Sequence, residues 1–216
     1  MSGNLIPNIL YRGAKIESGV NSVSTIRSAG IFTNLAKGGD PVYIKKTGII
    51  EAILQHIAPQ NVKEILLKEI SHFLSFSSDC KIAKCYASDK SSDNILINCG
   101  DENSIQRYIV TLNIDDQFLI FNRINGVYTL EYDCDLSLCE FCIKTEKKIK
   151  HKLLLFDVVT LLSSHPEWSN DTNALLSAKR DKEWLVMPFD FLSNLAGESA
   201  RMSPSNIWTV AYYKFA

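Results

Sequence analysis

The sequence of 216 residues lacks several features that would assign it to a large class of proteins. It has no apolar run near the ~20 residues of a membrane-spanning helix, and its first residues show neither the basic nor the apolar stretch of a secretion signal. Neither charge is in excess, because 23 Lys and Arg face 24 Asp and Glu, so a broadly basic nucleic-acid binder is not indicated. We expect a cytoplasmic protein, or one delivered into the cytoplasm of a target cell, with no membrane partner.

The sequence also lacks internal repeats, proline-rich linkers and blocks of like charge. Its length suits one compact domain, and 46% hydrophobic with 22% charged residues is ordinary for a folded chain. We therefore predict a single domain over residues 1–216.

The spacing of apolar residues changes along the chain from a helical period to the alternation of strands. Helices are expected over residues 18–29, 48–57, 60–70 and 81–87. Strands are expected over residues 9–12, 72–76, 95–98, 105–114, 118–122, 127–132, 183–187 and 207–215, and loops over 34–41 and 165–171. Segment 153–163 fits either type, and we favour a helix from Phe156. Helices first and strands later predict an α+β fold.

Three of the six cysteines form the one cluster with metal-like spacing, C-x4-C-x2-C over Cys134, Cys139 and Cys142. A zinc site with His151 as fourth ligand is one interpretation. Structural zinc sites usually show two such halves and only one is present, so free, reduced cysteines are favoured. No metal is expected.

The first of three short motifs is Leu10-Tyr11-Arg12-Gly13. An arginine that ends a strand can hold a phosphate with two hydrogen bonds, and a following glycine lets a ligand approach the backbone. The alternative is an ordinary surface arginine.

The second motif runs from Phe73 to Asp79 and contains Ser75 and Ser77. Alternation in a strand would point both hydroxyls to one face, where a polar ligand or a carboxylate would satisfy them. The alternative is a polar strand edge followed by a helix cap.

The third motif is Asp181-Lys182-Glu183, followed by an apolar strand. We expect the two carboxylates to share a strand face, so their pKa values should separate, since two close carboxylates do not ionise together. Solvated charges at a strand start are the alternative.

In this order, the three motifs resemble the mono-ADP-ribosyltransferases, and more narrowly the arginine–serine–glutamate class with cholera-type toxin chains and pierisin-like enzymes. The family's tyrosine-arginine opening is matched by Tyr11-Arg12. Its aromatic-x-Ser-Thr-Ser strand is matched by residues 73–77, with Phe76 in place of threonine. Its acidic-or-Gln-x-Glu motif is matched by residues 181–183, with Asp181 at the variable position.

The resemblance implies an α+β fold with split mixed or antiparallel β-sheets around an NAD cleft and with N-terminal helices. It implies transfer of ADP-ribose from NAD, as co-substrate, to a macromolecular acceptor, with release of nicotinamide. The acceptor would be a protein side chain such as arginine, or a nucleic-acid base. An intracellular toxin, a delivered effector or a toxin–antitoxin component is the expected setting, with an antitoxin or inhibitor protein as a partner. The alternatives are an NAD glycohydrolase and an inactive relative that serves as a binding module.

The resemblance also implies roles for individual residues. Glu183 would stabilise the cationic transition state, Ser75 would orient it, and Asp181 would position or deprotonate the acceptor; these are the expected catalytic residues. The residues expected to bind NAD are Arg12, Gly13, Ser75 and Ser77. In the family, glutamate at the position of Asp181 often accompanies arginine acceptors, so aspartate leaves the acceptor open.

The sequence leaves two further assignments undecided. Phe73 and Tyr86 are both candidates to stack on nicotinamide. His56 is interpreted as a surface or boundary residue of a helix, whereas His72, next to the serine strand, could reach the pocket.

Overall fold

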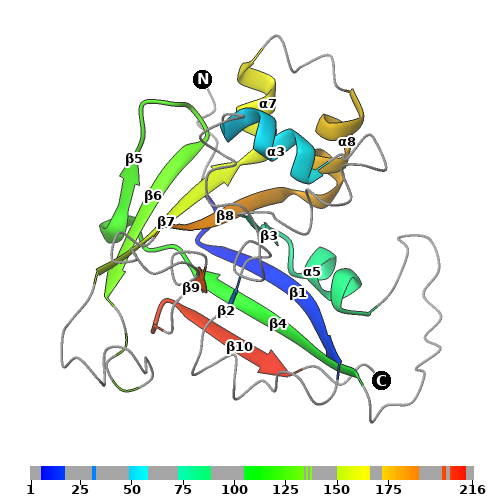
Figure 1. Ribbon diagram of the computed structural model, residues 1–216, viewed down its shortest axis with the longest axis vertical. Coiled ribbons are helices and arrows are strands. Elements are labelled where there is room, and N and C mark those ends of the chain that lie inside the picture. The colour runs from blue at the N-terminus through cyan, green and yellow to red at the C-terminus, as the bar shows by residue number, and fades with distance from the viewer. Residues whose placement is uncertain are drawn as a thin grey trace.

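A computed structural model describes residues 6–17, 31–32, 49–57, 73–88, 105–133, 135, 137, 150–165, 172–189, 201–202 and 205–212. It shows a mixed α+β fold built on a curled antiparallel sheet (Figure 1). The elements of the first half are β1 (Ile9–Glu17), β2 (Ile31–Phe32), α3 (Ile49–Ile57), β3 (Leu74–Ser77), α5 (Cys80–Ser88) and β4 (Ile105–Asn113). Those of the second half are the 3-10 turn η3 (Asp116–Phe118), β5 (Leu119–Phe121), β6 (Val127–Asp133), β7 (Lys150–Asp157), α7 (Val158–Ser164), α8 (Thr172–Asp181), β8 (Glu183–Phe189), β9 (Arg201–Met202) and β10 (Trp208–Tyr212).

The main sheet has eight strands in the order β10-β4-β1-β3-β8-β7-β6-β5, and β2 pairs with β9 separately. Strands β1 and β4 are paired along their whole length, from Ile9 to Glu17. By contrast, β1 and β3 share a single register pair, Tyr11 with Ser77. The sheet is therefore weakly joined at this point, and β1, β4 and β10 run in a different direction from β7 and β8 in Figure 1.

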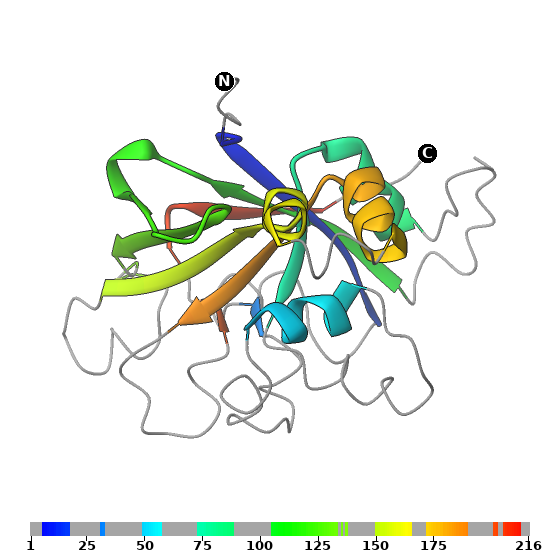
Figure 2. The ribbon, with the colours of Figure 1, turned by 90° about the horizontal axis from the view of Figure 1, so that it is seen from above.

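Both faces of β7 and β8 are covered. One face contributes alternate side chains such as Trp184 and Val186 to a core inside the curl of the sheet. The other face, with Leu185 and Met187, packs under α3, α7 and α8, which gather on one side of β7 and β8 in Figures 1 and 2. Helix α5 lies separately against β1 and β4. Burial on both faces accounts for the continuous apolar run that makes up β8.

Most of the predicted elements within the described residues are confirmed, with shifted ends. The two helices expected over 48–57 and 81–87 are α3 and α5, and the strands expected over 9–12, 72–76, 105–114, 118–122, 127–132, 183–187 and 207–215 correspond to β1, β3, β4, β5, β6, β8 and β10. The coarse prediction of an α+β fold is confirmed. The expectations for residues 18–29, 34–41, 60–70, 95–98 and 166–171 lie outside the described residues.

Two assignments in the second half need correction. The helix favoured from Phe156 begins at Val158, because β7 extends through Asp157. The side chains of Leu153 and Leu155 pack in the core inside the curl of the sheet, and that of Phe156 packs in the core beneath the helices. Because both faces of the strand are buried, its residues do not alternate between apolar and polar, and the sequence does not identify a strand. Helix α8 was not predicted at all: its sequence is mostly polar, and the side chains it buries are those of Ala174 and Ala178.

No helix within the described residues is both long and apolar enough to cross a membrane.

Candidate functional site

A pocket of about 500 Å³ opens where β1, β3 and β8 come together, with α3, α5 and α8 around its rim. Its volume lies within the range of pockets that bind small molecules and cofactors. Six of the residues that line it are those singled out in the three sequence motifs, namely Arg12, Gly13, Ser75, Ser77, Asp181 and Glu183. Segments far apart in the sequence therefore meet at one concave surface.

Arg12 lies in the middle of β1, so the expectation that it ends a strand is wrong. Its Nη1 group donates a hydrogen bond of 2.9 Å to the backbone oxygen of Ser75, which joins β1 to β3 where the two strands share one register pair. Its Nε atom is buried and has no hydrogen-bond partner within the described residues. Burial lowers the pKa of Arg12, and nearby Tyr108 opposes the shift. A half-buried cation whose Nε donor is unused among the described residues suits an anionic ligand.

Ser75 contacts His56, for which the sequence indicates no role in the pocket. The Nε2 atom of His56, on the last turn of α3, lies 2.8 Å from the Oγ atom of Ser75. The ring of Phe73 packs edge-on against His56, with ring centroids 5.7 Å apart. His56 lies three and four residues after the buried Ile53 and Ala52, so it belongs to the apolar face of α3. That position was the signal available in the sequence.

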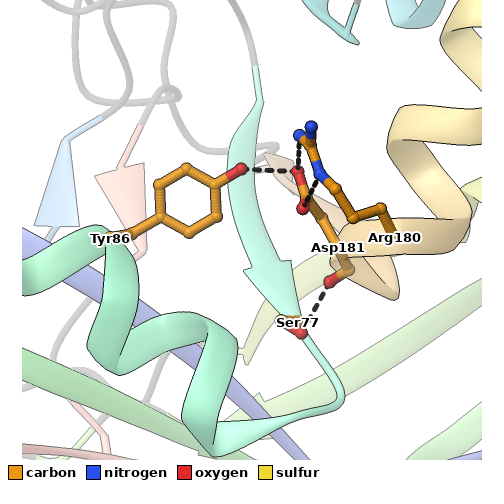
Figure 3. Close-up of polar contacts among 4 residues, drawn as sticks. All are labelled: Ser77, Tyr86, Arg180 and Asp181. Carbon is orange, nitrogen blue, oxygen red and sulfur yellow. Dashed lines mark hydrogen bonds and ion pairs between the residues drawn. The ribbon is translucent and has the colours of Figure 1, made fainter. Parts of the chain in front are cut away.

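The hydroxyl of Ser77 is engaged by the backbone. It donates a hydrogen bond of 2.7 Å to the carbonyl oxygen of Asp181 (Figure 3). It also accepts a hydrogen bond of 3.0 Å from the backbone N–H of Asp79. The side chain is 4% exposed. Ser77 thus ties the end of β3 and the start of α5 to the end of α8, which positions Asp181.

The expectation that Asp181 and Glu183 share a strand face is wrong, since Asp181 is the last residue of α8 and Glu183 the first of β8. Between them, Lys182 has a φ of 45°, a conformation that is unusual outside glycine. The Lys182 carbonyl accepts a hydrogen bond of 3.2 Å from the N–H of Ser78. Its ammonium pairs with Asp79 at 2.8 Å, and this hydrogen bond is the main cause of the lowered pKa of Asp79. These contacts hold the turn.

Both carboxylate oxygens of Asp181 accept hydrogen bonds (Figure 3). Oδ2 lies 2.5 Å from the Tyr86 hydroxyl and 2.9 Å from Nη2 of Arg180, and Oδ1 lies 2.7 Å from Nε of Arg180. Burial acts to raise the pKa of Asp181, but these hydrogen bonds outweigh it, and the pKa is lowered. Burial and the contact with Asp181 raise the pKa of Tyr86 to about 12. The carboxylate is therefore held ionised.

Glu183 lies opposite Ser77 in the pairing of β3 with β8, so Ser75 is its diagonal neighbour on the same sheet face. The side chain is half-buried and lines the pocket. Glu183 and Asp181 thus approach the pocket from two different elements.

Packing against helix α5 explains why a glycine is needed at position 13, and the sequence did not show this. A Cβ atom at this position would lie 1.7 Å from the carbonyl oxygen of Ala83, in α5. The close approach that glycine permits here is that of helix α5 to β1. Gly13 also lines the pocket, so its expected role in NAD binding stays a prediction.

The structure separates the two aromatic candidates. Tyr86 lines the pocket and is 57% exposed. Phe73 is 4% exposed and packs between His56 and Phe156, in the core beneath α3. Tyr86 is thus the better placed of the two to touch a ligand, and Phe73 supports His56. His72 lies outside the described residues.

The cysteine cluster of the zinc hypothesis (Cys134, Cys139 and Cys142) lies outside the described residues. His151, its expected partner, is buried in β7 with its ring 5.4 Å from that of Tyr132. Within the part of the chain that the structure describes, no group of three His, Cys, Asp or Glu side chains could hold a metal ion.

Comparisons of the chain with protein-family models, with curated proteins and with solved structures found no significant match.

Proposed function

We propose that the chain is an NAD-dependent mono-ADP-ribosyltransferase, with a single catalytic domain over residues 1–216. One observation carries the proposal. Arg12 from β1, Ser75 from β3 and Glu183 from β8 line one pocket, although the motif resemblance that selected them used only their order in the sequence. An unrelated set of three polar residues would have no reason to converge.

The sheet supports the finer fold that the resemblance implies. The weak β1–β3 junction divides the strands into two groups, and the pocket lies at this junction. A split sheet with its ligand at the division is the architecture proposed for NAD binding in this chain. The lack of a Gly-rich dinucleotide motif does not count against NAD, because such a motif belongs to parallel βαβ units.

In the proposed reaction, the bond that breaks joins the nicotinamide nitrogen of NAD to C1′ of its ribose. The electron pair leaves with nicotinamide, which becomes neutral, and positive charge develops on the sugar. Arg12 would bind a phosphate of NAD through its charge and its unused Nε donor. Tyr86 would offer its exposed ring to nicotinamide.

Glu183 would accept a hydrogen bond from the ribose 2′-hydroxyl, and its negative charge would stabilise the cationic transition state. Ser75 lies diagonal to Glu183 and would orient it. His56 holds the Ser75 hydroxyl at 2.8 Å, so it acts as a positioning residue. The acceptor nucleophile then bonds to C1′ and releases its proton to water. A protein side chain or a nucleic-acid base as acceptor, and a role as a toxin or effector countered by an inhibitor protein, follow from the resemblance.

The test uses NAD labelled on its adenylate part, incubated with cell lysate and purified protein. The proteins compared are the unaltered chain, Glu183→Gln, and the matched control Glu131→Gln, whose glutamate lies in β6 and pairs with Lys152. We expect labelled macromolecules with the unaltered chain and the control, and at least a hundredfold less with Glu183→Gln. Protease or nuclease treatment then identifies the class of acceptor.

Other outcomes of this test would replace the proposal. Free nicotinamide without transferred label would indicate an NAD glycohydrolase. Neither product, in lysates from several sources, would indicate a binding module. Full transfer by a folded Glu183→Gln variant would remove Glu183 from the site.

A further inference from the structure

In the proposed enzyme, the carboxylate of Asp181 would select the acceptor. This carboxylate already binds two side chains of the protein itself. Arg180 binds it through Nε at 2.7 Å and Nη2 at 2.9 Å, and Tyr86 adds a third hydrogen bond (Figure 3). Arg180 and Tyr86 also line the pocket. The carboxylate of Asp181 is thus bound by a guanidinium that belongs to the pocket itself.

A carboxylate selects a guanidinium acceptor by forming two parallel hydrogen bonds with it. In this chain, the side chain of the adjacent residue makes that pair of contacts. Because Arg180 is tethered next to Asp181, its effective concentration exceeds that of a free acceptor. A second guanidinium would also bring another positive charge to a place that already carries one.

We propose, on the basis of the proposed function, that Arg180 is a specificity-determining residue that excludes guanidinium acceptors, so that the acceptor is an uncharged group. Two of the five N–H groups of the Arg180 guanidinium are used for Asp181 and the guanidinium also contacts the Tyr86 hydroxyl, which leaves at least two N–H groups as donors. The Arg180 side chain is 64% exposed, so these donors are accessible to an acceptor. They suit a group that accepts hydrogen bonds, such as a carbonyl oxygen or a ring nitrogen.

The state of Asp181 agrees with this role. Its lowered pKa makes it a weak base, which suits a carboxylate that holds Arg180 and Tyr86 in place better than one that removes a proton from an arginine. Asp181 is therefore a positioning residue, and Arg180 is the group that meets the acceptor.

The experiment uses agmatine, a small guanidinium compound, as the probe. Formation of ADP-ribosyl-agmatine is measured by mass spectrometry, together with nicotinamide release, for the unaltered chain and for Arg180→Gln. We expect the modification of agmatine, relative to nicotinamide release, to rise at least tenfold in Arg180→Gln. The double variant Arg180→Gln/Asp181→Asn should lose this gain, because it lacks the charge that would bind agmatine. Arg123→Gln, in the exposed turn between β5 and β6, is the matched control and should behave as the unaltered chain.

A second measurement does not depend on turnover. Ligand-observed NMR should detect agmatine bound to Arg180→Gln, and no binding to the unaltered chain or to the double variant. Circular dichroism verifies that each variant is folded. In one outcome, agmatine binds only to Arg180→Gln, but neither the unaltered chain nor any variant cleaves NAD. This result would contradict the proposed function, yet it would support the conclusion that Arg180 excludes guanidinium compounds.

Two results would overturn the inference while the proposed function stands. One is modification of agmatine by the unaltered chain at the rate of Arg180→Gln. The other is a folded Arg180→Gln variant that cleaves NAD but neither binds nor modifies agmatine.

Discussion

Ser75 and Ser77 lie two residues apart on one strand, and the structure predicts opposite consequences for removing their hydroxyls. Ser77 is buried, and its hydroxyl makes two hydrogen bonds with the backbone of Asp181 and Asp79. Ser75 is half-buried, and its hydroxyl contacts His56 in the open pocket. The first hydroxyl therefore supports the fold, and the second belongs to the site.

The magnitude follows from the number of bonds and from burial. Ser77→Ala removes two hydrogen bonds worth about 1 kcal/mol each, so it should lower the free energy of unfolding by about 2 kcal/mol. For a chain of this size, that loss corresponds to a fall in Tm of roughly 4–8 °C. Ser75→Ala should cost less than about 1 kcal/mol, because water in the pocket can replace its partner.

The assay is urea unfolding followed by circular dichroism, together with nicotinamide release measured well below the lower Tm. The midpoint should fall for Ser77→Ala with an unchanged slope, which indicates a loss of stability alone. Ser75→Ala should unfold almost as the unaltered chain does, yet release nicotinamide at least tenfold more slowly. Equal losses of stability, or a larger loss for Ser75→Ala, would refute the assignment of Ser77 as the residue that holds the end of α8.

Three further predictions concern other residues of the pocket. Gly13→Ala should destabilise the chain by about 3 kcal/mol or more, since its Cβ would overlap the backbone of Ala83. Neutral substitutions change the free energy of unfolding by no more than roughly 0.5 kcal/mol, so a Tm that differs by less than about 2 °C from the unaltered value would contradict the packing of α5 on β1. The difference in tyrosinate absorbance between the unaltered chain and Tyr86→Phe should show a pKa of about 12, and Asp181→Asn should move it toward the usual value of about 10. Because this pKa is raised on folding, the stability that Tyr86 contributes is complete below pH 10 and is lost as the pH rises toward 12; a transition at the usual pH would disprove the contact. Arg12→Lys keeps a charge but loses the planar donor set, so we expect the KM for NAD to rise about tenfold, and an unchanged KM would remove Arg12 from NAD binding.

Alternation and apolar spacing were sufficient to find most of the individual elements. In β6, the buried side chains Tyr128, Leu130 and Tyr132 alternate with the more exposed Thr129 and Glu131, and this period can be read from the residues themselves. Helix α8 was not predicted because it buries two alanine side chains and is stabilised by contacts with α3, α7 and β8. An element whose stability comes from tertiary packing carries little local signal.

The sequence by itself determined the α+β class, the approximate place of most strands and the identity of six residues that reach one pocket. These depend on local periodicity and on motifs in order. Only the tertiary structure decided what each of the six contacts, because those contacts join residues far apart in the chain. It brought His56 to Ser75, placed α5 over Gly13, and turned the chain at Lys182 so that Asp181 meets Arg180 and Tyr86. Hydrogen bonds and close packing act at atomic range, and the folded chain, not the order of its residues, sets those distances.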